Sequence, residues 1–201
     1  MPSLRRAYEL RDRVSDVERF YIETLYDRDF TGNLEREQRT LETWAESYPR
    51  DALPLGLISG LALSSTGKYE LAIAEADKAI TLDPDLSPAY SNKSFNQLLL
   101  NRLADAEITI RRATERKLEV TGFVLHRYFI AFLNGDGEDM RLKAALARAN
   151  RATEDAISHV EALGCSLRPV ARGETDVRGR KDADPKIPVV EEARAEYARL
   201  P

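Results

Sequence analysis

Glycine, proline and alanine recur along this chain at a nearly constant spacing of 34 or 35 residues. The recurring pairs are Gly32 and Gly67, Pro49 and Pro84, Ala72 and Ala106, and Ala79 and Ala113. Unlike residue types that keep the same separation indicate one structural unit that is used several times in succession. The spacing therefore predicts a stacked repeat, in which each unit packs mainly against its neighbours.

The first unit has the pattern of two short helices. Ser15 and Glu18 have the spacing of a capping box ahead of an apolar stripe in residues 15–30. A second stripe, in residues 34–49, ends at Pro49, which cannot donate the next helical hydrogen bond. These two stripes predict a helical hairpin.

The stretch TGKYELAIAEADKAITLDP, residues 66–84, predicts the same hairpin more clearly. Gly67 suits a chain reversal, because glycine adopts a left-handed backbone without steric cost. Ala72 and Ala79 share a helix face, where small side chains let paired helices approach closely. Tyr69 fills space beside these alanines, and Pro84 ends the unit.

These features resemble the tetratricopeptide repeat (TPR) family, whose unit is 34 residues long. The family pattern W-x2-L-G-x2-Y…A-x3-F…P fits residues 53–86 best, with Gly60, Ala72 and Pro84 at its glycine, alanine and proline. Gly56 and Ser59 replace the tryptophan and leucine of the family, so the first helix departs from the pattern. The residues assigned to the repeat signature are Gly32, Pro49, Gly60, Gly67, Tyr69, Ala72, Ala79, Pro84, Ala106, Ala113 and Gly135.

Several phrases are similar to the TPR segments that follow the catalytic domain of bacterial eukaryotic-like serine/threonine protein kinases. They include FYIETLYDRDFTGNLE, LALSSTGKYELAIAEADKAITLDP and, near the end, KDADPKIPVVEEARAEYARL. The kinase motifs themselves are absent, and HRYF at 126–129 carries Tyr128 where a catalytic loop needs aspartate. The sequence thus predicts a non-enzyme.

The resemblance implies an all-α fold, a right-handed superhelical solenoid of TPR-like hairpins with a C-terminal loop and a closing helix. The expected units in residues 1–150 are 18–52, 53–86, 87–120 and 121–150. Residues 151–180 are expected to form a helix and a loop, because glycine, proline and charge dominate their second half. Residues 181–201 are expected to contain a capping helix at about 188–199.

In the TPR family, ligands contact the inward face of the first helix of each unit. The matching residues here are Ile22, Tyr26, Leu57, Leu61, Ser91, Asn92, Phe95, Leu125, His126 and Phe129. Family members that bind the acidic C-termini of heat-shock chaperones use lysine, arginine and asparagine on this face, and the lysines and arginines are missing here. An apolar or amphipathic peptide is therefore the expected ligand, with packing between units as the alternative role of these residues.

Other functional classes have little support in the composition. Net charge is −4, which argues against nucleic acid binding. Charged residues throughout the first 20 positions are untypical of a signal peptide, and no apolar run is long enough for a membrane helix, so a cytoplasmic location is expected. With one cysteine, Cys165, and two histidines, His126 and His159, neither a metal nor a cofactor is predicted. The acidic segment 134–140 is interpreted as a turn with a solvated acidic cap, with an ion site as the alternative.

Three functions remain open at this point. The first is a protein-interaction scaffold, which binds a partner protein or peptide on the concave face. The second is a regulatory appendage or remnant of a bacterial serine/threonine kinase system. The third is self-association into a homo-oligomer, through a surface that includes Trp44 or through the terminal surfaces.

Overall fold

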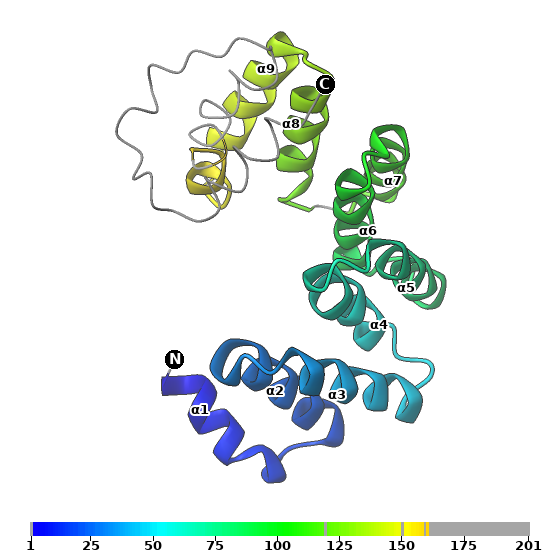
Figure 1. Cartoon of the computed structure of the whole chain (residues 1–201), viewed down its shortest axis with the longest axis vertical. Coiled ribbons are helices and arrows are strands. Elements are labelled where there is room, and N and C mark those ends of the chain that lie inside the picture. Colours follow the sequence, from blue (N-terminus) through cyan, green and yellow to red (C-terminus); the bar gives the residue numbers. More distant parts are fainter. Residues whose placement is uncertain (1, 119, 150, 159, 161–201) are drawn as a thin grey trace, which may run out of the picture. The chain divides into compact units, whose positions relative to one another are not determined.

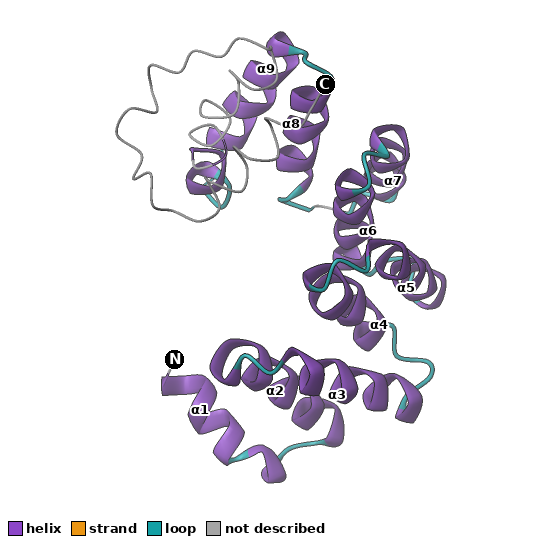
Figure 2. Cartoon of the chain, in the orientation of Figure 1, coloured by secondary structure: helices purple, strands orange, loops and turns teal. Residues whose placement is uncertain are grey.

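The computed structural model describes residues 2–118, 120–149, 151–158 and 160, and throughout this part the regular structure is helical, without strands (Figure 2). The α-helices are α1 (Pro2–Glu9), α2 (Asp16–Tyr26), α3 (Leu34–Ser47), α4 (Leu53–Leu57), α5 (Tyr69–Leu82), α6 (Ser87–Leu99), α7 (Leu103–Glu115), α8 (Phe123–Leu133) and α9 (Gly137–Arg148). The other labelled elements are a 3-10 turn, η1 (Arg11–Arg13), and two π-helical segments, η2 (Asp27–Thr31) and η3 (Ile58–Leu63), and residues 154–158 are also helical. The expected all-α class is confirmed.

The chain divides into two units, Met1–Ile157 and Ser158–Pro201, and the labelled helices belong to the first. Within that unit, adjacent helices pack as antiparallel pairs: α2 with α3, α4 and η3 with α5, α6 with α7, and α8 with α9 (Figure 1). Contacts of α6 with α5, η3 and α8 join successive pairs. The helical hairpins predicted from the sequence are therefore confirmed. The loop and closing helix expected after residue 160, with Cys165, lie outside the described residues.

The turn inside each pair contains a residue with a left-handed backbone. Gly32, Gly67 and Gly135 have φ of 68°, 75° and 71°, and Asn101 takes this role in the third pair with φ of 57°. The four residues are separated by 35, 34 and 34 positions. This confirms the turn predicted at Gly67. The third pair had no visible glycine signal because asparagine is one of the few other residues that tolerate this conformation.

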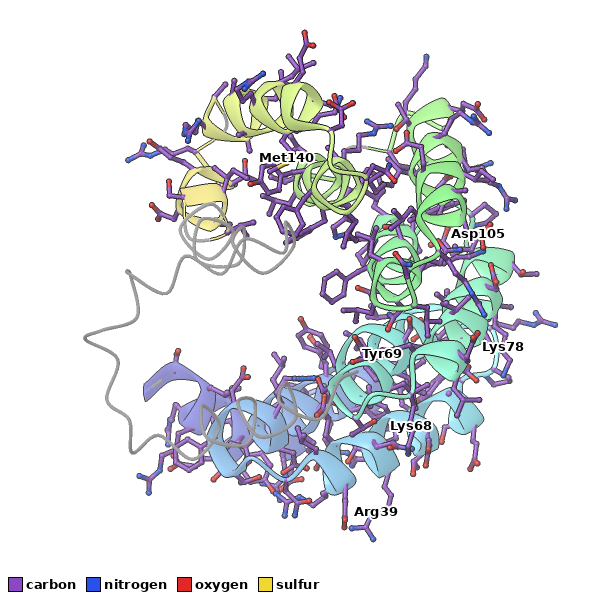
Figure 3. The ribbon with its side chains drawn as sticks, turned by 45° about the horizontal axis from the view of Figure 1, so that its top comes forward. Arg39, Lys68, Tyr69, Lys78, Asp105 and Met140 are labelled. Atoms are coloured by element: carbon purple, nitrogen blue, oxygen red, sulfur yellow. The ribbon has the colours of Figure 1, made fainter. Side chains whose placement is uncertain are left out.

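The second helices bury the same positions in all four pairs. These positions are Glu37, Leu41 and Trp44 on α3, Ala72, Ala76 and Ala79 on α5, Ala106, Ile110 and Ala113 on α7, and Met140, Ala144 and Ala147 on α9. Met140 points toward α8, whereas Lys78 on α5 extends away from the neighbouring helices (Figure 3). The predicted alanine faces thus form the contact between paired helices.

The first pair uses larger side chains at these positions. Trp44 is fully buried, its ring stacks 6.0 Å from that of Phe20, and its Nε1 donates a hydrogen bond of 3.1 Å to Asp51. The expectation that Trp44 offers a surface for self-association is therefore wrong, because the side chain is part of the core.

Two further observations concern α2: how the helix begins, and which of its residues are exposed. Ser15 and Glu18 form the predicted capping box at the start of α2. Tyr21, which lies within the apolar stripe of residues 15–30, is 42% exposed. Neither α1 nor the two π-helical segments were expected.

In the described residues, no helix is both long enough and apolar enough to cross a membrane.

Candidate functional site

The residues predicted to contact a partner lie on the first helices of the four pairs, and we call them the candidate surface. They are Ile22 and Tyr26 on α2, Leu57 on α4, Leu61 in η3, Ser91, Asn92 and Phe95 on α6, and Leu125, His126 and Phe129 on α8. Phe95 is 39% exposed and His126 is 8% exposed, while the other members are half-buried. The set therefore combines side chains that are open to solvent with others that already have packing roles.

At the first pair, α1 packs on the candidate surface. The ring of Tyr26 stacks on that of Tyr8 from α1, with centroids 3.8 Å apart, and on that of Phe30 at 4.8 Å. The guanidinium of Arg11 lies 4.1 Å from the Tyr8 ring and forms an ion pair of 3.2 Å with Glu23. Tyr26 is thus engaged within the molecule. Helix α1 was not predictable from the sequence, because its half-buried residues are scattered among arginines.

Asn92 connects the third pair to the second. Its Nδ2 donates a hydrogen bond of 3.0 Å to the carbonyl oxygen of Gly56, next to Leu57 in the chain. Leu57 itself packs against the core cluster that includes Trp44. Gly60 faces Asn92 closely enough that an added Cβ would lie 2.3 Å from Nδ2. Asn92 and Leu57 are therefore packing residues as well as members of the candidate surface.

The third and fourth pairs bring Phe95 and His126 together. Their rings lie 5.7 Å apart with an interplanar angle of 28°. The Nδ1 atom of His126 is 2.9 Å from the hydroxyl of Ser94, a fully buried residue of α6. Burial lowers the pKa of His126 from its ordinary value of 6.5 to about 4, so the imidazole is neutral at physiological pH. Ser94 was not anticipated, and its distance of 32 residues from His126 leaves no sequence signal.

The remaining members on α8 are less closely connected. Among the described residues, Phe129 makes a ring contact with its neighbour Tyr128, at 6.1 Å and 74°. Leu125 is half-buried. The structure thus joins Phe95 of α6 and His126 of α8, and Leu125 and Phe129 lie beside His126 on α8.

Basic side chains near the candidate surface are already paired. Lys93 forms an ion pair of 2.6 Å with Asp77 of α5, and Arg127 forms one of 3.1 Å with Glu107 of α7. Each cation follows Asn92 or His126 directly in sequence and is bound to the preceding helix pair. The positive charges next to the candidate surface are therefore used to connect neighbouring pairs.

A buried ionic cluster lies around η2. Glu37 is fully buried and accepts a 3.1 Å bond from Arg28, which also donates to Ser65 of the next pair at 3.1 Å. Burial raises the pKa of Glu37, and the charge of Arg28 partly opposes this increase. Asp27, also buried, pairs with Arg36. No sequence motif predicted this cluster, which connects the first helix pair to the second.

The acidic segment 134–140 has the predicted structural role. Asp136 caps α9 by accepting hydrogen bonds from the backbone N–H groups of Glu138 and Asp139 at 3.1 and 2.9 Å.

In the part of the chain that is described, histidine, cysteine and carboxylate residues form no group of three or more that could hold a metal ion. Tyr128, in the HRYF sequence, lies within α8.

Comparison with protein-family models, curated proteins and solved structures finds no match to this chain.

Proposed function

We propose that this chain is a non-catalytic TPR-like solenoid, with right-handed superhelical stacking, that binds an apolar or amphipathic segment of a partner protein. The binding site is the candidate surface on the first helices. Support comes from the four equivalent sets of buried positions on the second helices, since stacked hairpins of this type present one helix of each pair to a ligand.

The exposure of Phe95 is the observation that carries this proposal. A phenylalanine that is 39% exposed retains apolar area for a partner to cover. Full burial of such a side chain contributes about 1.5–3 kcal/mol, and Phe95 has part of this still to gain. The half-buried Ser91 lies on α6 with Phe95, and the half-buried Leu125 lies on α8, so a bound segment would contact side chains of both helices.

The charges favour an apolar ligand over an acidic one. Lys93 and Arg127 are bound to Asp77 and Glu107, and His126 is neutral at physiological pH. An acidic tail would therefore meet few free positive groups on the candidate surface. Acidic C-terminal peptides are expected to bind no better than scrambled sequences.

Selection from a library of peptides blocked at both ends tests this function. We expect wild-type protein to select apolar or amphipathic sequences, and the double variant Phe95→Asp, Phe129→Asp to bind them at least about tenfold more weakly. The matched control is Ile108→Asp on α7, because Ile108 is 43% exposed but lies on a second helix. Equal losses in the control, or selection of acidic peptides, would contradict the proposal.

Self-association is a second use that the exposed leucines of α9 favour. Leu142 and Leu146 are 55% and 52% exposed and lie four residues apart, on one helix face. Sedimentation over a range of concentrations tests it. A wild-type protein that associates, and a Leu142→Glu, Leu146→Glu variant that stays monomeric, would establish this use of α9.

A further inference from the structure

Tyr26 and Phe95 occupy equivalent positions in their helix pairs. Each lies six residues before the residue with a left-handed backbone, which is Gly32 in the first pair and Asn101 in the third. Phe95 is 39% exposed, whereas Tyr26 is half-buried, and the ring of Tyr8 from α1 stacks on it with centroids 3.8 Å apart. A position that is open in the third pair is therefore covered in the first pair by another segment of the chain.

Two side chains that are three residues apart make this contact. Tyr8 stacks on Tyr26, and Arg11 in η1 forms an ion pair of 3.2 Å with Glu23 of α2. The guanidinium of Arg11 also lies 4.1 Å from the centroid of the Tyr8 ring and donates a hydrogen bond of 2.9 Å to the Tyr8 carbonyl oxygen. Glu23 and Tyr26 are likewise three residues apart, so they share a face of α2. The contact thus matches ring to ring and cation to carboxylate at the same spacing.

Helix α1 lies beside α2 and is held there by few other contacts (Figure 1). It has eight residues, and a helix this short is only marginally stable in water by itself. Among its described side chains none is buried, and Leu4, Ala7 and Tyr8 are half-buried. The described members of the core cluster around Trp44 all come from other elements. Departure of α1 would therefore leave the core of the first pair in place.

We infer that Glu23 and Tyr26 form a docking site for a segment with an aromatic residue and an arginine three positions apart, which α1 fills until such a segment of a partner protein replaces it. The occupant is defined by the contact that α1 makes, because a partner segment needs the same two groups to regain the ring stack and the ion pair. An acidic segment would be repelled by Glu23. The inference rests on the proposed function in one respect: Tyr26 belongs to the candidate surface, so release of α1 extends that surface over the first pair.

Binding of a peptide with the sequence of residues 2–14, blocked at both ends, tests the site on full-length chains. In the double variant Tyr8→Ala, Arg11→Ala, which we call the release variant, the chain's own segment lacks both groups and the site is open. We expect the peptide to bind the release variant at least about tenfold more tightly than wild type, in which α1 occupies the site. Equal affinities, or no binding to the release variant, would refute the site.

The matched control is the double variant Arg5→Ala, Arg6→Ala. These two side chains are 68% exposed, and their ion pairs stay within α1. Peptide affinity of this control is expected to equal that of wild type. A control that binds as tightly as the release variant would show that any weakening of α1, and not the aromatic and arginine pair, opens the site. Circular dichroism checks that both variants fold.

Addition of Glu23→Gln to the release variant locates the bound peptide. This change removes the carboxylate that pairs with arginine, so binding is expected to weaken about two- to fivefold. A peptide that lacks the arginine is expected to bind both receivers equally. Unchanged binding of the complete peptide after Glu23→Gln would mean that it binds elsewhere and would contradict the site.

Hydrogen exchange of the wild-type protein tests whether α1 leaves α2 without unfolding of the rest. We expect the backbone amides of α1 to exchange at least about tenfold faster than those of α2, because a weakly held segment opens locally. Equal protection of the two helices would overturn replacement by a partner. Association of wild-type chains that the release variant abolishes would place α1 of a second copy on the site, and would also overturn it.

Peptide selection on the release variant tests the specificity and separates this inference from the proposed function. Sequences with an aromatic residue followed by arginine three positions later are expected to be enriched, and selection without this pair would refute the assigned ligand. If the 2–14 peptide binds as expected but wild type selects no apolar peptide through Phe95, the proposed function fails and the α2 site stands. If wild type selects such peptides but the 2–14 peptide binds neither protein, the α2 site fails and the proposed function stands.

Discussion

An alanine at position 60 would place its Cβ 2.3 Å from the Nδ2 atom of Asn92, which at the same time donates a hydrogen bond to Gly56. This distance is far below van der Waals contact, so Gly60 is required by the neighbouring pair. The glycine that resembles a family signature in the sequence thus has a specific partner in space, one pair further along the chain.

Gly60→Ala is predicted to destabilise the protein by about 1–2 kcal/mol, because Asn92 must move and its bond to Gly56 is lost. With Asn92→Ala already present, the same change is predicted to be neutral or stabilising by up to about 1 kcal/mol, since alanine favours helix over glycine. Urea unfolding of the four proteins gives the coupling.

Gly137→Ala is the control for this cycle, since a Cβ at Gly137 would have no atom within 4 Å. Its stability is expected to stay the same or rise slightly. Additive effects of Gly60→Ala and Asn92→Ala would show that the two residues are not in contact.

Arg28→Ala is predicted to destabilise the protein by about 3 kcal/mol at neutral pH, because it leaves the buried carboxylate of Glu37 without a counter-charge. The pKa of Glu37 is already raised by burial, and loss of Arg28 raises it further. The native state then binds a proton at higher pH than the unfolded state. The destabilisation is therefore predicted to shrink between about pH 7 and about pH 5.

Unfolding midpoints in urea across this pH range test the effect of Arg28→Ala. Arg111→Ala is the matched control, because Arg111 pairs with Glu115 on the exposed surface of α7. Such a pair contributes at most about 0.5 kcal/mol. A loss at Arg28 that is equally small, or that grows on acidification, would contradict the buried ion pair.

Lys117→Gly is predicted to stabilise the protein by about 1 kcal/mol. Lys117 follows α7 with φ of 60°, a conformation in which a Cβ is strained and glycine is not. Lys117→Ala retains the strained backbone and removes the long side chain, so it is expected to be close to neutral. Thermal melting of the two variants distinguishes relief of strain from loss of charge, and a stabilised alanine variant would favour the latter.

The backbone requirements of this fold were visible in the sequence. Gly32 and Gly67 recur because a left-handed turn selects glycine, and Ala72 and Ala79 recur because closely packed helices select small side chains. In these cases one position permits few residue types, so spacing alone is informative. Asn101 was less visible because asparagine has many other uses.

The polar contacts could not be predicted in the same way. Ser94 and His126 are 32 residues apart, and Arg28 and Ser65 are 37 apart. Serine, histidine and arginine are acceptable at many helix positions, and their pairing depends on how the helices pack. For the same reason the sequence could name Phe95 and His126 as surface candidates but could not tell that one is exposed and the other buried.

The neutral His126 makes stability depend on pH. Its pKa of about 4 in the folded protein lies below the ordinary value of 6.5, so between these values the unfolded chain binds a proton that the folded protein does not. The contribution of His126 to stability is therefore complete above about pH 7 and decreases as pH falls toward 4, by up to about 3 kcal/mol. His126→Gln removes this titration and keeps an amide at the site. The difference in unfolding free energy between wild type and His126→Gln, measured in urea at several pH values, cancels the contributions of Glu37 and the other carboxylates that the two proteins share. We expect wild type to lose stability relative to the variant on acidification; a difference that stays constant from pH 7 to pH 4 would mean that His126 is solvated and not buried between α6 and α8.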